Sequence, residues 1–123
     1  MTAAGKVFGL TERTALFGEA VIRFAKGLRR DPVSTPLISQ LVRSSTSVVA
    51  NWMEAGAAQS CKNFDHKIGI CKKEARETMH LLRMLAAADS SSRADCRTLW
   101  REAHELAMIF SAILKKRRAG VET

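Results

Sequence analysis

Apolar residues recur alternately three and four positions apart in four segments of the chain, which is the spacing of a helix that packs in a bundle. The four stripes are Leu10, Phe17, Val21, Phe24 and Leu28; Ile38, Leu41, Val48, Trp52 and Ala55; Phe64, Ile68, Cys71, Ala75, Thr78, Leu82 and Leu85; and Cys96, Leu99, Ala103, Leu106, Phe110 and Ile113. Thr14 and Ser45 fill the gaps in the first two stripes. The pattern predicts helices over about 10–29, 36–58, 61–88 and 93–117.

Short polar segments separate these predicted helices. Thr35 is expected as the N-cap of the second helix with Pro36 at its first position. The third is expected to start near Ser60, and Gly120 is expected to end the fourth. Four amphipathic helices with three short connections predict an all-α, up-down-up-down antiparallel four-helix bundle. A chain of 123 residues is about the length of one domain, so residues 1–123 are expected to form a single bundle.

The composition is typical of a helical protein and also indicates its cellular location. Tyr is absent, and 7 Gly and 2 Pro leave few strand or turn signals. The longest apolar runs fall far short of the roughly 20 residues of a membrane span, and no leader pattern precedes them. Three cysteines, an odd number without CxxC spacing, argue against a disulfide framework. We therefore expect a cytoplasmic protein.

A line of polar residues on the second predicted helix is unusual for a solvated face. At about 100° per residue, Arg43, Ser47, Asn51 and Glu54 fall within roughly a quarter of the circumference. Ser and Asn are mediocre helix formers, whereas a solvated face favours Lys, Glu, Gln or Arg. We expect this line, with Trp52 nearby, to form a helix or subunit interface in which Arg43 and Glu54 find partners. The alternative is that the line simply faces solvent.

The charge of the chain favours a polyanionic partner. The formal net charge is +8, and basic residues form one line on the fourth helix and a shorter line on the third. The residues expected to bind nucleic acid are Arg93, Arg97, Arg101, Lys115, Lys116, Arg117, Arg118, Lys72, Arg76 and Arg83. No nucleic-acid motif is present and aromatic residues are few, so contacts to the backbone are expected to dominate. The alternative is that these residues only solubilise the surface and complement the helix dipole.

Catalytic patterns are weak in this sequence. The histidines and cysteines lack the spacing of a metal site, and no Gly-rich phosphate loop occurs. Glu74 and Glu77 share helical spacing, but Lys73 and Arg76 beside them indicate ordinary surface ion pairs. Trp100, like the tryptophan of the second helix, is expected to anchor a core or an interface. We expect no enzymatic activity, no cofactor and no metal.

Three segments also carry a family resemblance: QLVRSSTSVVANWMEA, KNFDHKIGICKKEARETMHLLRML and WREAHELAMIFSAILKK. Over about residues 17–116 the chain resembles the four helix bundle family that includes proteins encoded in intervening sequences of bacterial 23S ribosomal RNA genes. It departs from the family pattern at Trp52 and His80, where Tyr or another aromatic residue is expected, and at His104, where Asn is expected. The resemblance implies a homo-oligomer, specifically a ring-shaped pentamer. One related branch serves as the accessory protein of diversity-generating retroelements, which implies nucleic acid and a reverse transcriptase as partners.

These observations lead to one functional hypothesis and one alternative. The hypothesis is a non-enzymatic, self-assembling helical bundle whose basic face binds nucleic acid, structured RNA rather than DNA, mainly through the backbone. The alternative is an oligomeric scaffold or adaptor for an acidic protein partner, with no direct role in nucleic-acid binding.

Overall fold

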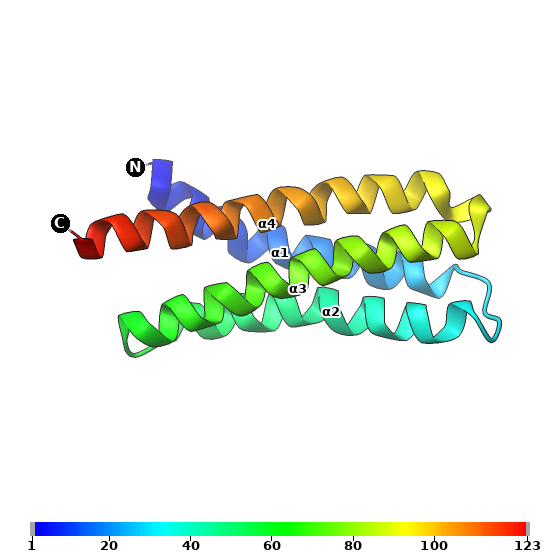
Figure 1. Cartoon of the computed structure of the whole chain (residues 1–123), viewed down its shortest axis with the longest axis horizontal. Helices are drawn as coiled ribbons and strands as arrows, with labels where there is room; N and C mark the ends of the chain where they lie inside the picture. The colour runs from blue at the N-terminus through cyan, green and yellow to red at the C-terminus, as the bar shows by residue number, and fades with distance from the viewer. Residues whose placement is uncertain (1, 123) are drawn as a thin grey trace.

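The computed structural model describes residues 2–122, and the side chains of residues 9–120. Over these residues the chain forms α1 (Thr2–Lys26), α2 (Ser34–Gly56), α3 (Cys61–Ala88), the short 3-10 helix η1 (Ser90–Ser92) and α4 (Arg93–Glu122). Each helix runs antiparallel to the next, and α1 also contacts α4, which closes a four-helix bundle (Figure 1). The predicted fold is confirmed. None of the helices described is both long and apolar enough to span a bilayer.

The four apolar stripes meet along the axis of the bundle. Phe110, Leu41 and Ile68 are fully buried there, together with most other members of the predicted stripes. Stripe residues near the helix ends, such as Leu28 and Phe64, are only half-buried and pack against the outside of this core. Burial of each large apolar side chain contributes about 1.5–3 kcal/mol, so the stripes supply the main driving force for folding.

The polar residues in the stripe gaps are buried as well. Thr14 is fully buried and donates a hydrogen bond to the carbonyl of Leu10 at 2.7 Å. Between α2 and α3, the hydroxyls of Ser44 and Thr78 lie 2.8 Å apart in the core. Thr78 donates its proton to the carbonyl of Glu74 at 2.8 Å, so its oxygen can accept from Ser44, for whose single proton the carbonyl of Leu41 at 3.2 Å is the alternative acceptor. Small hydroxyl residues therefore fit inside this bundle because each of these buried hydroxyls has a hydrogen-bond partner.

The start of α2 differs from the prediction of a Thr35 cap followed by Pro36. Both residues lie inside the helix; Val33, directly before Ser34, provides no side-chain cap, and the carboxylate of Asp31 caps the first turn instead. The Asp31 carboxylate accepts hydrogen bonds from the amides of Val33 and Ser34 at 2.9 and 2.8 Å, and Ser34 Oγ accepts from the Asp31 amide at 3.1 Å. These amides hold the pKa of Asp31 below its usual value. The reciprocal bonds make Asp31 and Ser34 a capping box one turn earlier than expected.

Of the other two predicted helix ends, one is confirmed and one is wrong. Ser60 caps α3 as expected, since its hydroxyl accepts a hydrogen bond from the Asn63 amide at 3.1 Å. Gly120 does not end α4, which continues to Glu122. No described glycine adopts the positive φ of a glycine C-cap, and a glycine inside a helix costs only about 1 kcal/mol. A helix can therefore pass through this residue.

Candidate nucleic-acid interface

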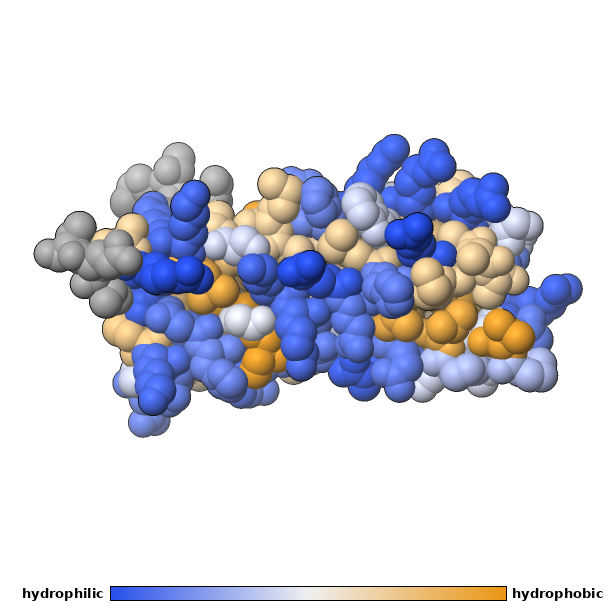
Figure 2. All heavy atoms as spheres, viewed as in Figure 1, coloured by the Kyte–Doolittle hydropathy of each residue, from blue (hydrophilic) through white to orange (hydrophobic). Residues whose placement is uncertain are grey.

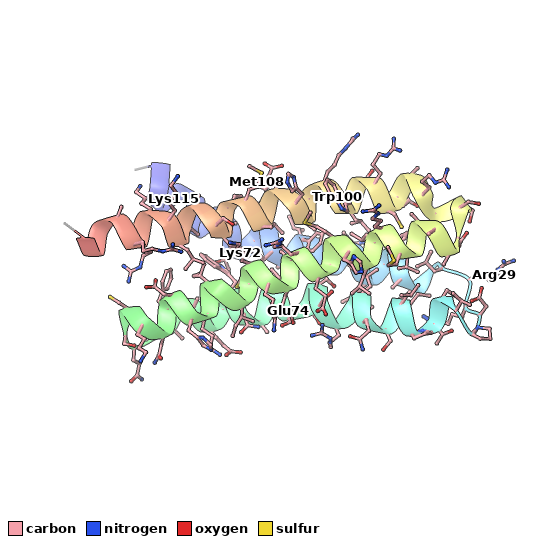
Figure 3. All side chains as sticks on the ribbon, viewed as in Figure 1. Arg29, Lys72, Glu74, Trp100, Met108 and Lys115 are labelled. Atoms are coloured by element: carbon pink, nitrogen blue, oxygen red, sulfur yellow. The ribbon has the colours of Figure 1, made fainter. Side chains whose placement is uncertain are left out.

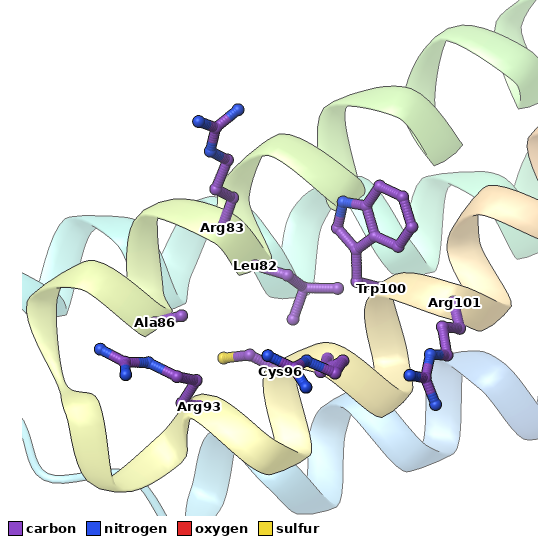
Figure 4. A pocket seen from close by; sticks show the side chains of 8 residues that line it. Leu82, Arg83, Ala86, Arg93, Cys96, Trp100 and Arg101 are labelled. Carbon is purple, nitrogen blue, oxygen red and sulfur yellow. The ribbon is translucent and has the colours of Figure 1, made fainter.

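An open groove of about 420 Å³ lies between the C-terminal half of α3 and the N-terminal half of α4. Its floor is apolar and consists of Leu82, Ala86 and Cys96, and the indole of Trp100 lines its edge. Its rim is basic and consists of four arginines, Arg83 from α3 and Arg93, Arg97 and Arg101 from α4 (Figure 4). We call this feature the arginine groove. It combines an apolar surface with a concentration of positive charge.

The spacing of the α4 arginines explains why they share one side of the groove. Arg93, Arg97 and Arg101 are four residues apart, so they project from one face of the helix with a rise of about 6 Å between neighbours. Arg83 joins them because η1 turns the chain back sharply and brings the end of α3 alongside α4. In the space-filling view, hydrophilic side chains project along this edge, next to exposed apolar atoms (Figure 2).

Carboxylates do not neutralise the rim. Among the described side chains, none of the four rim arginines forms an ion pair. The acidic residues of α4 that follow the groove face the other way: Arg13 of α1 lies 2.8 Å from Glu102 and 3.1 Å from Glu105. Four cations without counter-charges create a positive potential that attracts anions.

Trp100 lies at the edge of the groove rather than in the core. It is half-buried, and its ring stacks on His104 with centroids 5.1 Å apart and planes 16° apart. The sequence predicts only a core or interface anchor at this position. The sequence nevertheless contains a signal for an accessible ring. Trp100 directly precedes Arg101 and lies at the boundary of the fourth apolar stripe, where an aromatic side chain is only partly covered.

The basic residues predicted at the C-terminal end of α4 are not part of the groove. Lys115, Lys116 and Arg118 are exposed, but Lys115 follows Arg101 by a helical rise of about 21 Å. Figure 3 shows Lys115 far along α4 from Trp100. On α3, Arg76 is exposed and lies two turns before the groove. The predicted basic face is therefore divided into the groove and a separate C-terminal cluster.

Two of the predicted phosphate contacts are less accessible than the sequence suggests. Arg117 bonds Asp65 through Nε at 2.9 Å and lies over the ring of Phe64, with its guanidinium carbon 5.4 Å from the centroid. These contacts fasten the end of α4 to α3, and the hydrogen bond with Asp65 is the main cause that raises the pKa of Arg117. Lys72 is half-buried on α3 (Figure 3).

The polar line of α2 faces α3 of the same chain. Arg43 Nη1 lies 2.8 Å from Glu74 Oε2, and its other terminal nitrogen contacts Glu77. Glu54 bonds Lys67 Nζ at 2.6 Å. The prediction of ordinary surface pairs for Glu74 is wrong, because its side chain is only 6% exposed and its partner comes from α2. A subunit contact at this line stays a prediction.

The same network sets the charge state of Glu74. Burial raises the pKa of Glu74, but hydrogen bonds from Arg43 and Ser47 outweigh it and hold the pKa below its usual value. Asn51 donates to the carbonyl and the hydroxyl of Ser47 at 2.8 and 3.0 Å. Trp52 is on the core side of the helix, where its Nε1 donates to Thr11 Oγ1 at 3.0 Å. These contacts join α2 to α1 and α3.

The three cysteines are free thiols with different surroundings. Cys61 is exposed, whereas Cys71 and Cys96 are buried. Burial raises the pKa of Cys71 to about 12 and also raises the pKa of Cys96, so both stay protonated at neutral pH. Cys96 thus contributes a neutral surface to the groove floor. Within the described side chains, no group of three or more His, Cys, Asp and Glu residues is placed to hold a metal ion.

The fold and the groove define a small basic four-helix bundle with an anion-attracting surface. The chain belongs to the 23S rRNA-intervening sequence protein family, whose sequence model matches residues 10–112, which confirms the resemblance drawn from the sequence. It is similar to a crystal structure of a protein of unknown function from the S23 ribosomal protein family of Bacteroides thetaiotaomicron. That likeness has 27% sequence identity and a TM-score of 0.82, and it covers 89% of this chain and 98% of the other. Among curated proteins, no sequence matches the chain.

Proposed function

We propose that this protein is a non-enzymatic nucleic-acid-binding bundle of the cytoplasm that holds structured RNA through the arginine groove. The observation that carries the proposal is the set of four arginines around one groove, Arg83, Arg93, Arg97 and Arg101, none of which forms an ion pair among the side chains of residues 9–120. Guanidinium groups bind phosphate oxygens in a bidentate manner, and their weak hydration lowers the cost of leaving water. The matching family is described as 23S rRNA-intervening sequence protein, a description that is compatible with an RNA partner.

The surrounding charge supports phosphate binding over simple solubility. A solvated surface generally mixes both signs of charge, as the other faces of this bundle do where Arg13, Arg43 and Lys67 pair with carboxylates. No described carboxylate pairs with the arginines of the groove, so four like charges repel one another there. An anionic ligand relieves this repulsion and releases counterions, which adds to its affinity.

Self-assembly is a second part of the proposal. Met53 of α2 and Leu16 of α1 are 55% and 51% exposed, so both helices leave a large apolar side chain uncovered within one chain. A homo-oligomer, a pentamer by family resemblance, would cover such residues. Sedimentation of the purified protein tests this part. A monomer at micromolar concentration would contradict it.

The binding proposal is tested by reversing charge at the groove. Arg97→Glu with Arg101→Glu lowers the net charge by four units, and Lys26→Glu with Lys62→Glu lowers it equally at exposed residues outside the groove. Fluorescence anisotropy with a labelled structured RNA measures affinity, and circular dichroism checks folding. We expect the groove variant to lose at least about tenfold more affinity than the control.

Equal losses in the two variants would show that net charge alone governs binding and would contradict a phosphate site in the groove. If the unmodified protein bound no RNA at low salt, nucleic acid would be excluded as its ligand. The acidic protein partner would then become the explanation of the basic surface.

A further inference from the structure

The floor of the arginine groove is not explained by phosphate binding. A duplex backbone needs only the basic rim, yet the groove also exposes an indole ring above a floor of Leu82, Ala86 and Cys96. Its volume of about 420 Å³ lies in the range of sites that hold small organic groups. An apolar floor next to a cationic rim fits a ligand that carries a flat, weakly polar group beside an anion.

An unpaired nucleotide has both features. Its base has a π-face that stacks on aromatic rings and on guanidinium planes, and its phosphates suit the arginines. We propose that the groove binds a single-stranded segment of nucleic acid, with one base against Trp100 and the flanking phosphates on Arg97 and Arg101. This inference rests on the proposed function and narrows its ligand to unpaired nucleotides.

The surroundings of Trp100 favour this role. His104 stacks in parallel on the indole at 5.1 Å, which fixes the ring while the indole still lines the groove. A ring held in place loses little entropy when a base stacks on it. Arg93 and Arg83 extend the rim on either side of the floor, so a strand entering the groove meets cations from both helices (Figure 4).

Tryptophan fluorescence gives a direct test, because the chain has only two tryptophans. In a Trp52→Phe background, Trp100 is the sole reporter. The probes are oligouridine of about 12 nucleotides, within the site sizes of single-strand binders, a duplex of equal length, and inorganic polyphosphate. We expect oligouridine to quench Trp100, while duplex and polyphosphate bind without quenching. Oligodeoxythymidine of the same length distinguishes RNA from DNA as the source of the base.

Substitution of Trp100 is the second test of this inference. Trp100→Leu should weaken oligouridine binding by about 5- to 150-fold, the cost of one lost stacking contact. The same change should leave duplex binding within about twofold. Trp100→Phe keeps an aromatic ring and should retain most of the affinity, which separates stacking from loss of structure.

Three outcomes would overturn the inference. Equal losses for single strand and duplex, or no quenching by bound oligouridine, would leave a backbone site, and the proposed function would survive. A change of oligomeric mass in Trp100→Leu, measured by sedimentation, would show that a second copy of the chain occupies the groove. No binding of any probe at low salt would overturn the inference together with the proposed function.

Discussion

The buried carboxylate of Glu74 offers a test of how α2 and α3 are held together. Replacing Arg43 by Met keeps much of the apolar stem and removes the guanidinium that bonds Glu74 at 2.8 Å. A hydrogen bond to a charged group contributes about 1.5–3 kcal/mol. Because Arg43 is 46% exposed, solvent screening reduces this value, and we expect a loss of about 1–2 kcal/mol at pH 7. For a domain of this size the melting temperature should fall by roughly 3–10 °C.

The loss should depend on pH in a defined direction. The folded-state pKa of Glu74 is lowered, so its ion pair stabilises the protein above the unfolded pKa of about 4.3. This stabilisation disappears as the pH falls through the folded pKa. In Arg43→Met the carboxylate of Glu74 stays buried without a cationic partner. Protonation removes this unpaired charge and therefore lowers the cost of burying the side chain. The difference between the two proteins should therefore be largest near pH 7 and should shrink below about pH 4.

Thermal unfolding followed by circular dichroism at pH 7 and at about pH 3.5 measures both effects. Arg76→Met is the matched control, because Arg76 is exposed on α3 and forms no ion pair among the described residues. Its effect should stay within about 0.5 kcal/mol. Losses of the same size in the two variants, or a loss in Arg43→Met that does not change with pH, would refute the reasoning.

Two further predictions concern packing and thiol chemistry. A Cβ added at Gly18 would lie 3.0 Å from Val49 Cγ2. Gly18→Ala should therefore lower the free energy of unfolding, measured with denaturant, by about 1 kcal/mol more in the wild-type protein than in a Val49→Ala background. Equal effects in both backgrounds would show that α1 and α2 do not approach closely at this glycine. Ellman's reagent should modify one thiol per native chain, Cys61, and three after denaturation, because burial keeps Cys71 and Cys96 protonated and covered. Rapid modification of all three in the native protein would contradict the burial of these residues.

The fold could be predicted because its main determinant is periodic. A helix places every third or fourth residue on one face, so the stripes were visible in the sequence and their inner members are buried. The start of α2 was harder, since both Asp31 and Thr35 precede a proline and both are capping residues. Only the reciprocal bonds of Asp31 with Ser34 decide between them.

The candidate site could be predicted in part. Helical spacing placed Arg93, Arg97 and Arg101 on one face, but spacing does not show which cations find acids on other helices. The sequence predicts a phosphate contact at Arg117, whereas the fold pairs this residue with Asp65. The groove floor was also not predictable, because its shape depends on how far α3 and α4 separate around Trp100.

The salt dependence of RNA binding tests the central claim most directly. Each phosphate neutralised on a duplex contributes about −0.9 to the slope of log K against log salt, and each phosphate on a single strand about −0.7. The four arginines of the groove therefore predict a slope of about −3 per bound site. Arg97→Ala with Arg101→Ala should reduce its magnitude by roughly half while the protein remains folded. An unchanged slope in this variant, or affinity independent of salt, would contradict binding through the arginine groove.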